Sequence, residues 1–251
     1  MVLAAVFLVA CLPSVGAARA PGDPIRLAHE EGDVAGFGTI YGPDGGEPIG
    51  FVEFRQTRHG DLLSMSRVAH FNDGSSDEDS ARVRVAGALE ALGGRSVIRD
   101  AAGVTTVDLT FDIAGQRIRG SWGSGGDRKT VDDHFDLSPG TYWGPLIFMV
   151  LKNFDANATD GRVVFRAVVP TPGPRVIDLE LVRMEPTQLR RTGAALDVTR
   201  YDLNPTVHWA IDPLIRAFIP ASHFFVRQGN PPGLARFAGP RNYAGQTIRI
   251  E

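Results

Sequence analysis

The sequence predicts a mainly β protein: a single strongly curved antiparallel sheet or open barrel of about a dozen strands that encloses one apolar helix. Three observations lead to this prediction. Apolar and polar residues alternate with a period of two along much of the chain, as strands that are packed on one face require. Glycine and proline are abundant, at 29 and 17 residues, and dispersed, as short strands joined by tight turns need. One segment, residues 145–154, is apolar on all sides, so the rest of the fold must enclose it.

The strands are predicted from this alternation in chain order. Gly36–Tyr41 and Ile49–Gln56 flank a turn-like run of glycine, proline and aspartate. Thr105–Asp112 alternates most clearly, and Gln116–Trp122 is expected to pair with it as a hairpin. The other predicted strands are Leu62–Phe71, Ala81–Ala86, Ser96–Arg99, Lys129–Leu137, Arg162–Val169, Val176–Met184, Gln188–Thr192, Ala195–Tyr201, Phe224–Gln228, Leu234–Phe237 and Thr247–Glu251.

The predicted helix follows Ser138-Pro139, a pair typical of a helix N-terminus. Pro145 would kink or restart the helix, so its regular part is expected at 145–154. In a β-rich chain the natural enclosure for such a helix is the concave side of a curved sheet. Residues 207–219 are compatible with a second short helix, broken at Pro213.

The N-terminal residues predict export. Residues 1–10 are apolar and too few to span a bilayer, which is typical of the core of a signal segment, predicted here at 1–20. Two processing routes fit: a lipobox-like site that would make Cys11 the lipidated residue, or cleavage at a small-residue site near residue 20. We expect a periplasmic or envelope location in a bacterium, a flexible neck at 21–35 and a single β-rich domain at 36–251.

Composition excludes several classes of function. The net charge of −3 gives no electrostatic case for binding nucleic acid or an anionic membrane surface. With a single cysteine the fold contains no internal disulfide. No phosphate-binding loop, nucleophile elbow or zinc-protease motif is present in the sequence, and no cofactor is expected.

Two polar clusters are candidates for chemistry. Asp73, Asp77 and Asp79 could supply oxygen ligands to Ca²⁺, but the spacing fails the EF-hand pattern, and the favoured interpretation is a solvated turn between two strands. Asp132, His134 and Asp136 share one face of a predicted strand and could form a metal or proton-transfer site. The alternative is that these three residues form the wet side of a sheet.

Aromatic residues are candidates for binding an apolar ligand. Tyr142, Trp143, Phe148 and Trp209 could line a pocket if the helix fills the hollow of the sheet incompletely. Core packing is the alternative for all four residues.

Short motifs carry a family resemblance over roughly residues 60–251. They are Phe71–Ser75, Val107–Asp112, His134–Pro139, Leu151–Asn153, Thr171–Arg175 and Ile248–Glu251. On these motifs the chain resembles a group of uncharacterised exported bacterial proteins with a domain of unknown function. This resemblance implies no activity and no catalytic residue. More loosely, strands around an enclosed helix are similar to half-barrels of the lipoprotein-carrier type. That similarity implies, at the level of fold alone, a hollow that holds acyl chains.

We therefore expect a non-enzymatic exported envelope protein that binds a lipid or other apolar ligand in the hollow of a half-barrel. The alternative is an envelope hydrolase or metal-binding enzyme that uses Asp132, His134 and Asp136. A third reading is an interaction module that pairs through an exposed strand edge. Membrane contact is expected only through a lipid on Cys11.

Overall fold

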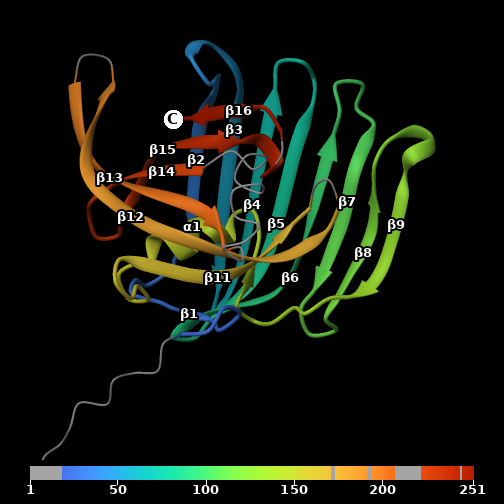
Figure 1. Cartoon of the computed structure of the whole chain (residues 1–251), viewed down its shortest axis with the longest axis horizontal. Coiled ribbons are helices and arrows are strands. Elements are labelled where there is room, and N and C mark those ends of the chain that lie inside the picture. Colours follow the sequence, from blue (N-terminus) through green and yellow to red (C-terminus); the bar gives the residue numbers. More distant parts are fainter. Residues whose placement is uncertain (1–18, 171–172, 192–193, 207–221, 244) are drawn as a thin grey trace, which may run out of the picture.

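Most of the chain forms one curved, open sheet with a helix on its concave side (Figure 1). The computed structural model describes residues 19–170, 173–191, 194–206, 222–243 and 245–251. Within these residues the sheet contains sixteen strands. The strands are β1 (Ile25–Arg26), β2 (Val34–Gly42), β3 (Gly45–His59), β4 (Leu62–Phe71), β5 (Ser76–Val85), β6 (Ala88–Arg99), β7 (Thr105–Asp112), β8 (Arg117–Trp122), β9 (Lys129–His134), β10 (Thr141–Tyr142), β11 (Arg162–Val169), β12 (Arg175–Arg191), β13 (Ala194–Pro205), β14 (Ser222–Arg227), β15 (Gly233–Pro240) and β16 (Thr247–Ile250).

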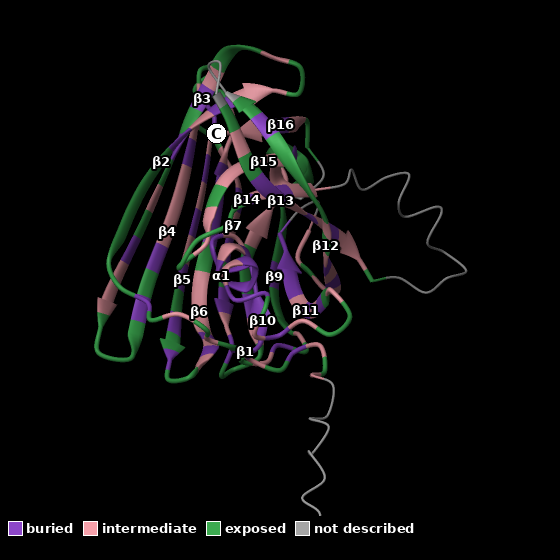
Figure 2. Ribbon diagram, turned by 90° about the vertical axis from the view of Figure 1, so that its left-hand side faces the viewer, coloured by how far each residue is buried: buried purple, intermediate pink, exposed green. Residues whose placement is uncertain are grey.

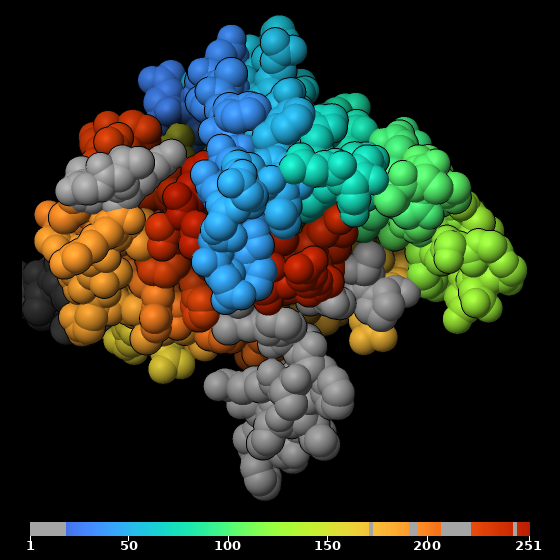
Figure 3. Space-filling model, turned by 90° about the horizontal axis from the view of Figure 1, so that it is seen from above, coloured from blue at the N-terminus to red at the C-terminus, as the bar shows by residue number. Residues whose placement is uncertain are grey.

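The strand order shows why the sheet stays open. Strands β2 to β9 are neighbours in chain order, as are β10 to β16, and the two series join where β16 pairs with β2. Seen from above, the blue residues of β2–β3 therefore lie beside the red C-terminal strands (Figure 3). The free edges of the sheet are β9 and β10, which are not paired with each other.

The prediction of a mainly β chain with one open sheet around a helix is confirmed, but the described sheet has sixteen strands rather than the predicted dozen. All described pairs along the main path are antiparallel except β10 and β11, which run parallel. Two strands, β1 and β10, are only two residues long and so show no alternation in the sequence. The two strands predicted within 176–192 are one strand, β12, whose register shifts between Arg183 and Pro186.

The single α-helix among the described residues, α1 (Leu146–Lys152), confirms the central prediction. It lies on the concave side of the sheet, where purple marks buried residues (Figure 2). Five of its seven residues are buried: Leu146, Ile147, Met149, Val150 and Leu151. Pro145 stands directly before the helix, and Asn153 ends it. Since no face of α1 is polar enough for water, its burial under the sheet stabilises both.

A glycine lets the helix region approach the sheet closely. The ring of Trp143 packs against Phe111 with centroids 4.9 Å apart, and its Nε1 donates to the backbone oxygen of Ser80 at 3.0 Å. A Cβ atom at Gly94 in β6 would lie 2.6 Å from this ring. Gly94 therefore belongs to the packing of β6 against Trp143, although Gly93-Gly94 looks like a strand break in the sequence.

Residues 25–33, part of the predicted flexible neck at 21–35, are built into the fold; we call them the N-terminal strap. Ile25 is fully buried and pairs with Leu89 of β6. Its backbone N–H donates to the Tyr142 hydroxyl at 2.8 Å, and that hydroxyl donates to the backbone oxygen of Leu89. Further on, the side chain of Asn153 accepts from the backbone N–H of Ala28 at 2.7 Å. These bonds tie the strap to the end of α1.

Candidate ligand-binding site

The wall of the sheet has a gap where β16 ends. Strand β16 pairs with β2 only through Arg249 with Tyr41 and Ile250 with Ile40, and the Glu251 backbone bonds to Thr39. Within the described chain, residues 34–38 of β2 and 233–236 of β15 have no β16 partner. We call the gap between these two unpaired edges the slot.

Behind the slot is a hollow of about 420 Å³, within the range of small-molecule sites. Its walls come from β2, β3 and the β14–β15 connection, and its floor is the face of α1 that points away from Trp143. We call it the apolar hollow because hydrophobic side chains dominate its lining: Val34, Phe37, Val52, Phe54, Phe148, Met149, Leu151, Val226, Pro231, Pro232, Leu234, Ala235 and Ile250.

The apolar hollow borders Gly36, one of two glycines that face inward on β2; beside the other, Gly38, a Cβ atom would lie 3.0 Å from Ile250, so the space there is already filled. Val34 pairs with the buried Gln56 and Ile40 is fully buried, so the alternate residues Gly36 and Gly38 point to the same inner face. A Cβ atom at Gly36 would meet nothing closer than the Cβ of Phe54 at 3.9 Å. The position therefore borders open space, and a larger side chain there would enter the hollow.

Exposed apolar side chains surround the slot. Val34, Phe37 and Leu234 are 44%, 70% and 42% exposed, and all three line the apolar hollow. A second hollow of about 350 Å³ shares Phe37 and Leu234 and adds Leu189 and Leu196 from the β12–β13 hairpin. Contiguous exposed apolar surface of this kind marks a site of binding or association.

Phe148, with Arg67 and Ile250, lines both the apolar hollow and a smaller inner cavity of about 80 Å³. Its ring packs edge-on against Phe224, with centroids 6.0 Å apart. Trp143 lies on the far side of the inner cavity, away from the slot. The Phe148 ring therefore lies between the two spaces.

The inner cavity is lined by two arginine–aspartate pairs. Arg67 contacts Asp79 at 2.6 Å, and Asp79 also accepts from the Ser96 hydroxyl at 2.8 Å. Arg241 binds Asp77 through two hydrogen bonds of 2.8 and 2.9 Å and lies 3.6 Å from the centroid of the Phe71 ring. The contacts between Arg241 and Asp77 join the β15–β16 turn to β5.

The three aspartates considered as calcium ligands form ion pairs and hydrogen bonds within the protein. Asp77 and Asp79 are buried on β5, each paired with an arginine, whereas Asp73 is in the preceding turn. Hydrogen bonds from Ser75 hold the pKa of Asp73 below its usual range. Among the described residues, no group of three or more His, Cys, Asp or Glu side chains is arranged to hold a metal ion.

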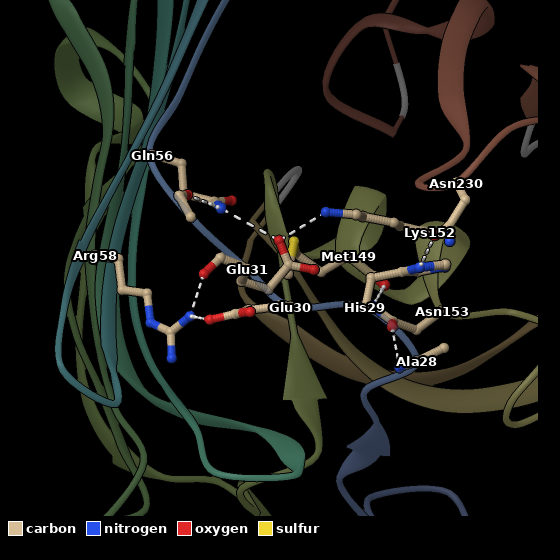
Figure 4. Close-up of polar contacts among 11 residues, drawn as sticks. Ala28, His29, Glu30, Glu31, Gln56, Arg58, Met149, Lys152, Asn153 and Asn230 are labelled. Carbon is tan, nitrogen blue, oxygen red and sulfur yellow. Dashed lines mark hydrogen bonds and ion pairs between the residues drawn. The ribbon is translucent and has the colours of Figure 1, made fainter.

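A buried polar cluster lies beside the apolar hollow (Figure 4). Lys152 at the end of α1 and Gln56 on β3 both line the hollow, and both donate to Oε2 of Glu31 in the strap, at 2.8 and 3.3 Å. The Glu31 side chain is 1% exposed. Its other oxygen, Oε1, is buried and accepts no hydrogen bond from any described residue. We call Glu31, Gln56 and Lys152 the polar cluster.

The structure does not bring Asp132, His134 and Asp136 together as a site. Asp132 is exposed and pairs with Arg117 and Arg119 of the adjacent strand. The hydrogen bond from Arg117 is the main reason that the pKa of Asp132 is lowered. Asp136 pairs with Arg166 of β11. Among the described contacts, none joins His134 to either carboxylate, so no observation favours the hydrolase or metal-enzyme alternative.

The aromatic candidates have different surroundings. Phe148 lines the apolar hollow and Trp143 the inner cavity, whereas the fully buried Tyr142 lines neither and joins the strap to β6. Burial raises the pKa of the Tyr142 hydroxyl. Trp209, with the rest of the predicted helix at 207–219, lies outside the described residues, as does Cys11.

Sequence reasoning missed Gly36, Phe37 and the polar cluster. The alternation Val34, Gly36, Gly38, Ile40 was a usable signal, because glycines on one face of a strand leave space beside it. The polar cluster gave no local signal, since its members come from three distant segments.

No described helix has the length and apolar character needed to cross a membrane.

No protein-family model matches the sequence. No curated protein matches it either. Among solved structures the chain is similar to a beta-barrel-like protein of a domain of unknown function, DUF1849, from Brucella abortus. The TM-score is 0.48 and the identity 9%, over 90% of this chain and 96% of that chain.

Proposed function

We propose that the protein binds a lipid or similar apolar molecule in the apolar hollow, which the ligand enters through the slot. The observation that carries this proposal is the hollow of about 420 Å³ with an exposed apolar rim at Val34, Phe37 and Leu234. Covering such a surface with a ligand is favourable at about 25 cal/mol for each Å² of apolar surface removed from water.

The proposal includes a location outside the cytoplasm. It rests on the apolar run at residues 1–10 and on the lipobox-like position of Cys11. The mass of the mature N-terminus, measured on protein from a cell-envelope fraction, tests it. An unprocessed chain in the cytoplasmic fraction would contradict it.

A substitution that fills the hollow tests the binding proposal. In Gly36→Leu the new side chain occupies the hollow, and at Gly36 the added Cβ meets no close atom. We expect the affinity for N-phenylnaphthylamine, an uncharged fluorescent probe of apolar sites, to fall at least about tenfold, the effect of losing ~1.4 kcal/mol of binding free energy. Ala35→Leu is the matched control, because the exposed Ala35 pairs with the exposed Arg55 on the outer face.

The outcomes are distinct. Loss of probe binding in Gly36→Leu alone, with a circular dichroism spectrum like that of the wild type, supports the proposal. Equal binding by both variants would contradict it. Native mass spectrometry of the protein purified from its own host gives a readout without any variant: a retained lipid supports the proposal, and a clean apo mass together with no probe binding opposes it.

A further inference from the structure

The charged groups around the apolar hollow balance one another. Three cationic side chains line it: Arg67, Lys152 and Arg236. Each contacts a carboxylate, at 2.6 Å to Asp79, 2.8 Å to Glu31 and 2.6 Å to Glu251. A charged ligand would therefore find no unpaired opposite charge among these groups, and it would lose its own hydration on entering.

Hydrogen-bonding capacity is nevertheless left over at the polar cluster. Oε1 of Glu31 is a buried acceptor without a donor among the described residues. Lys152 has three N–H donors, and the structure shows one of them used, by Oε2 of Glu31. A buried carboxylate oxygen without a donor costs free energy that a ligand can recover.

We propose that the polar cluster binds the hydroxyl group of an uncharged amphiphile, whose apolar chain lies in the hollow. This inference rests on the proposed function and specifies the class of its ligand. A hydroxyl can donate to Oε1 of Glu31 and accept from Lys152 at the same time. A carboxylate can only accept and would be repelled by Glu31, and an ether has no hydrogen to donate.

The cluster is held in place before any ligand arrives. Arg58 of β3 donates to the backbone oxygen of Glu31. The backbone N–H of Arg58 donates to Asp33 at 2.7 Å. Asn153, next to Lys152, fixes the strap at Ala28. Because these bonds hold the strap on both sides of Glu31, little conformational freedom would be lost when the hydroxyl binds.

The experiment compares three ligands with the same chain and different head groups. Dodecanol, dodecyl methyl ether and dodecanoate are measured by displacement of N-phenylnaphthylamine from the full-length protein. We expect dodecanol to bind at least about tenfold more tightly than either of the others, as one hydrogen bond to a charged group would give. The double variant Glu31→Leu/Lys152→Met removes both charges and both hydrogen-bonding groups together, so that neither charge is left buried and unpaired and neither side chain can bind a hydroxyl.

We expect the double variant to bind dodecanol and the ether equally, with its ether affinity unchanged. Glu30→Gln is the matched control: it removes the neighbouring carboxylate, whose side chain is 88% exposed, and it should keep the preference for the alcohol. Equal binding of dodecanol and ether by the wild type would overturn the inference and leave the proposed function standing. Tightest binding of dodecanoate would overturn it as well. If the probe itself does not bind, the proposed function fails and this inference fails with it.

Discussion

The two sides of α1 differ in how they are filled. Toward β5–β7, the side chains of Trp143 and Phe111 are almost completely buried and in contact. Toward β2 and β15, the helix faces a hollow whose rim residue Phe37 is 70% exposed. The inner face of β7 carries Val107, Leu109 and Phe111, whereas that of β2 carries two glycines. The comparison shows that the sheet is packed where its inner face carries large side chains and borders a hollow where that face carries Gly36.

The largest effect is expected from opening the packed side. Trp143→Ala removes a ring that contacts Phe111 and donates to Ser80, so we expect the free energy of unfolding to fall by about 3–5 kcal/mol. The corresponding fall in melting temperature is roughly 10 °C, measurable by calorimetry. A fall in the free energy of unfolding of less than about 1 kcal/mol would contradict the comparison. It would mean that the side of α1 near Trp143 tolerates a cavity as well as the side that faces the apolar hollow.

Phe148→Ala, on the hollow side, should cost much less. Its ring already borders empty space on two sides, so we expect the free energy of unfolding to fall by only about 1 kcal/mol. The substitution should enlarge the apolar hollow toward the inner cavity. Alcohols of increasing chain length should show the result, as the variant should prefer longer chains than the wild type does. An unchanged preference would mean that the ligand does not reach Phe148.

The smallest effect concerns charges on the outside of the packed side. Arg95 donates two hydrogen bonds to Asp108, at 2.7 and 2.8 Å, which lowers the pKa of that carboxyl. A carboxyl with a lowered pKa stabilises the folded state above its unfolded pKa of about 3.9, and this contribution is lost as the pH falls through the folded pKa.

The Arg95→Met variant tests this charge effect. NMR titration should show the pKa of Asp108 rising toward its ordinary value. The accompanying loss of stability at neutral pH should stay below about 1 kcal/mol, because both side chains are partly exposed. A loss comparable with that of Trp143→Ala would show that surface charge, rather than packing, distinguishes the two sides.

Much of the fold could be predicted because period-two alternation is a local property. Leu62–Phe71, Thr105–Asp112 and Arg162–Val169 are strands with the predicted bounds, and the uniformly apolar helix is enclosed as expected. The strap could not be predicted as part of the fold, since its contacts with Asn153 and Tyr142 join residues more than a hundred positions apart.

The candidate site could be predicted only in part for the same reason. Trp143 and Phe148 were named from their aromatic character, and both line internal spaces. Glu31 and Lys152 meet only because the strap crosses the end of α1. Asp132 and His134 are alternate residues of β9, whereas Asp136 lies beyond its end, and the neighbouring strand supplies arginines that bind the Asp132 carboxylate.

The junction of β16 with β2 has a consequence for motion. Two residue pairs and the Thr39–Glu251 backbone bonds hold the first long strand to the last one, whereas β2 and β3 pair along almost their whole length. Strands joined by few backbone hydrogen bonds separate at a low cost in free energy. The pairing of β16 with β2 should therefore open before the longer strand pairings of the sheet do. The amides of Thr39 and Glu251 should then exchange with deuterium well ahead of those in β4 and β7. The proposed ligand, with its long apolar chain, could then enter between β16 and β2 while the core around Trp143 stays folded.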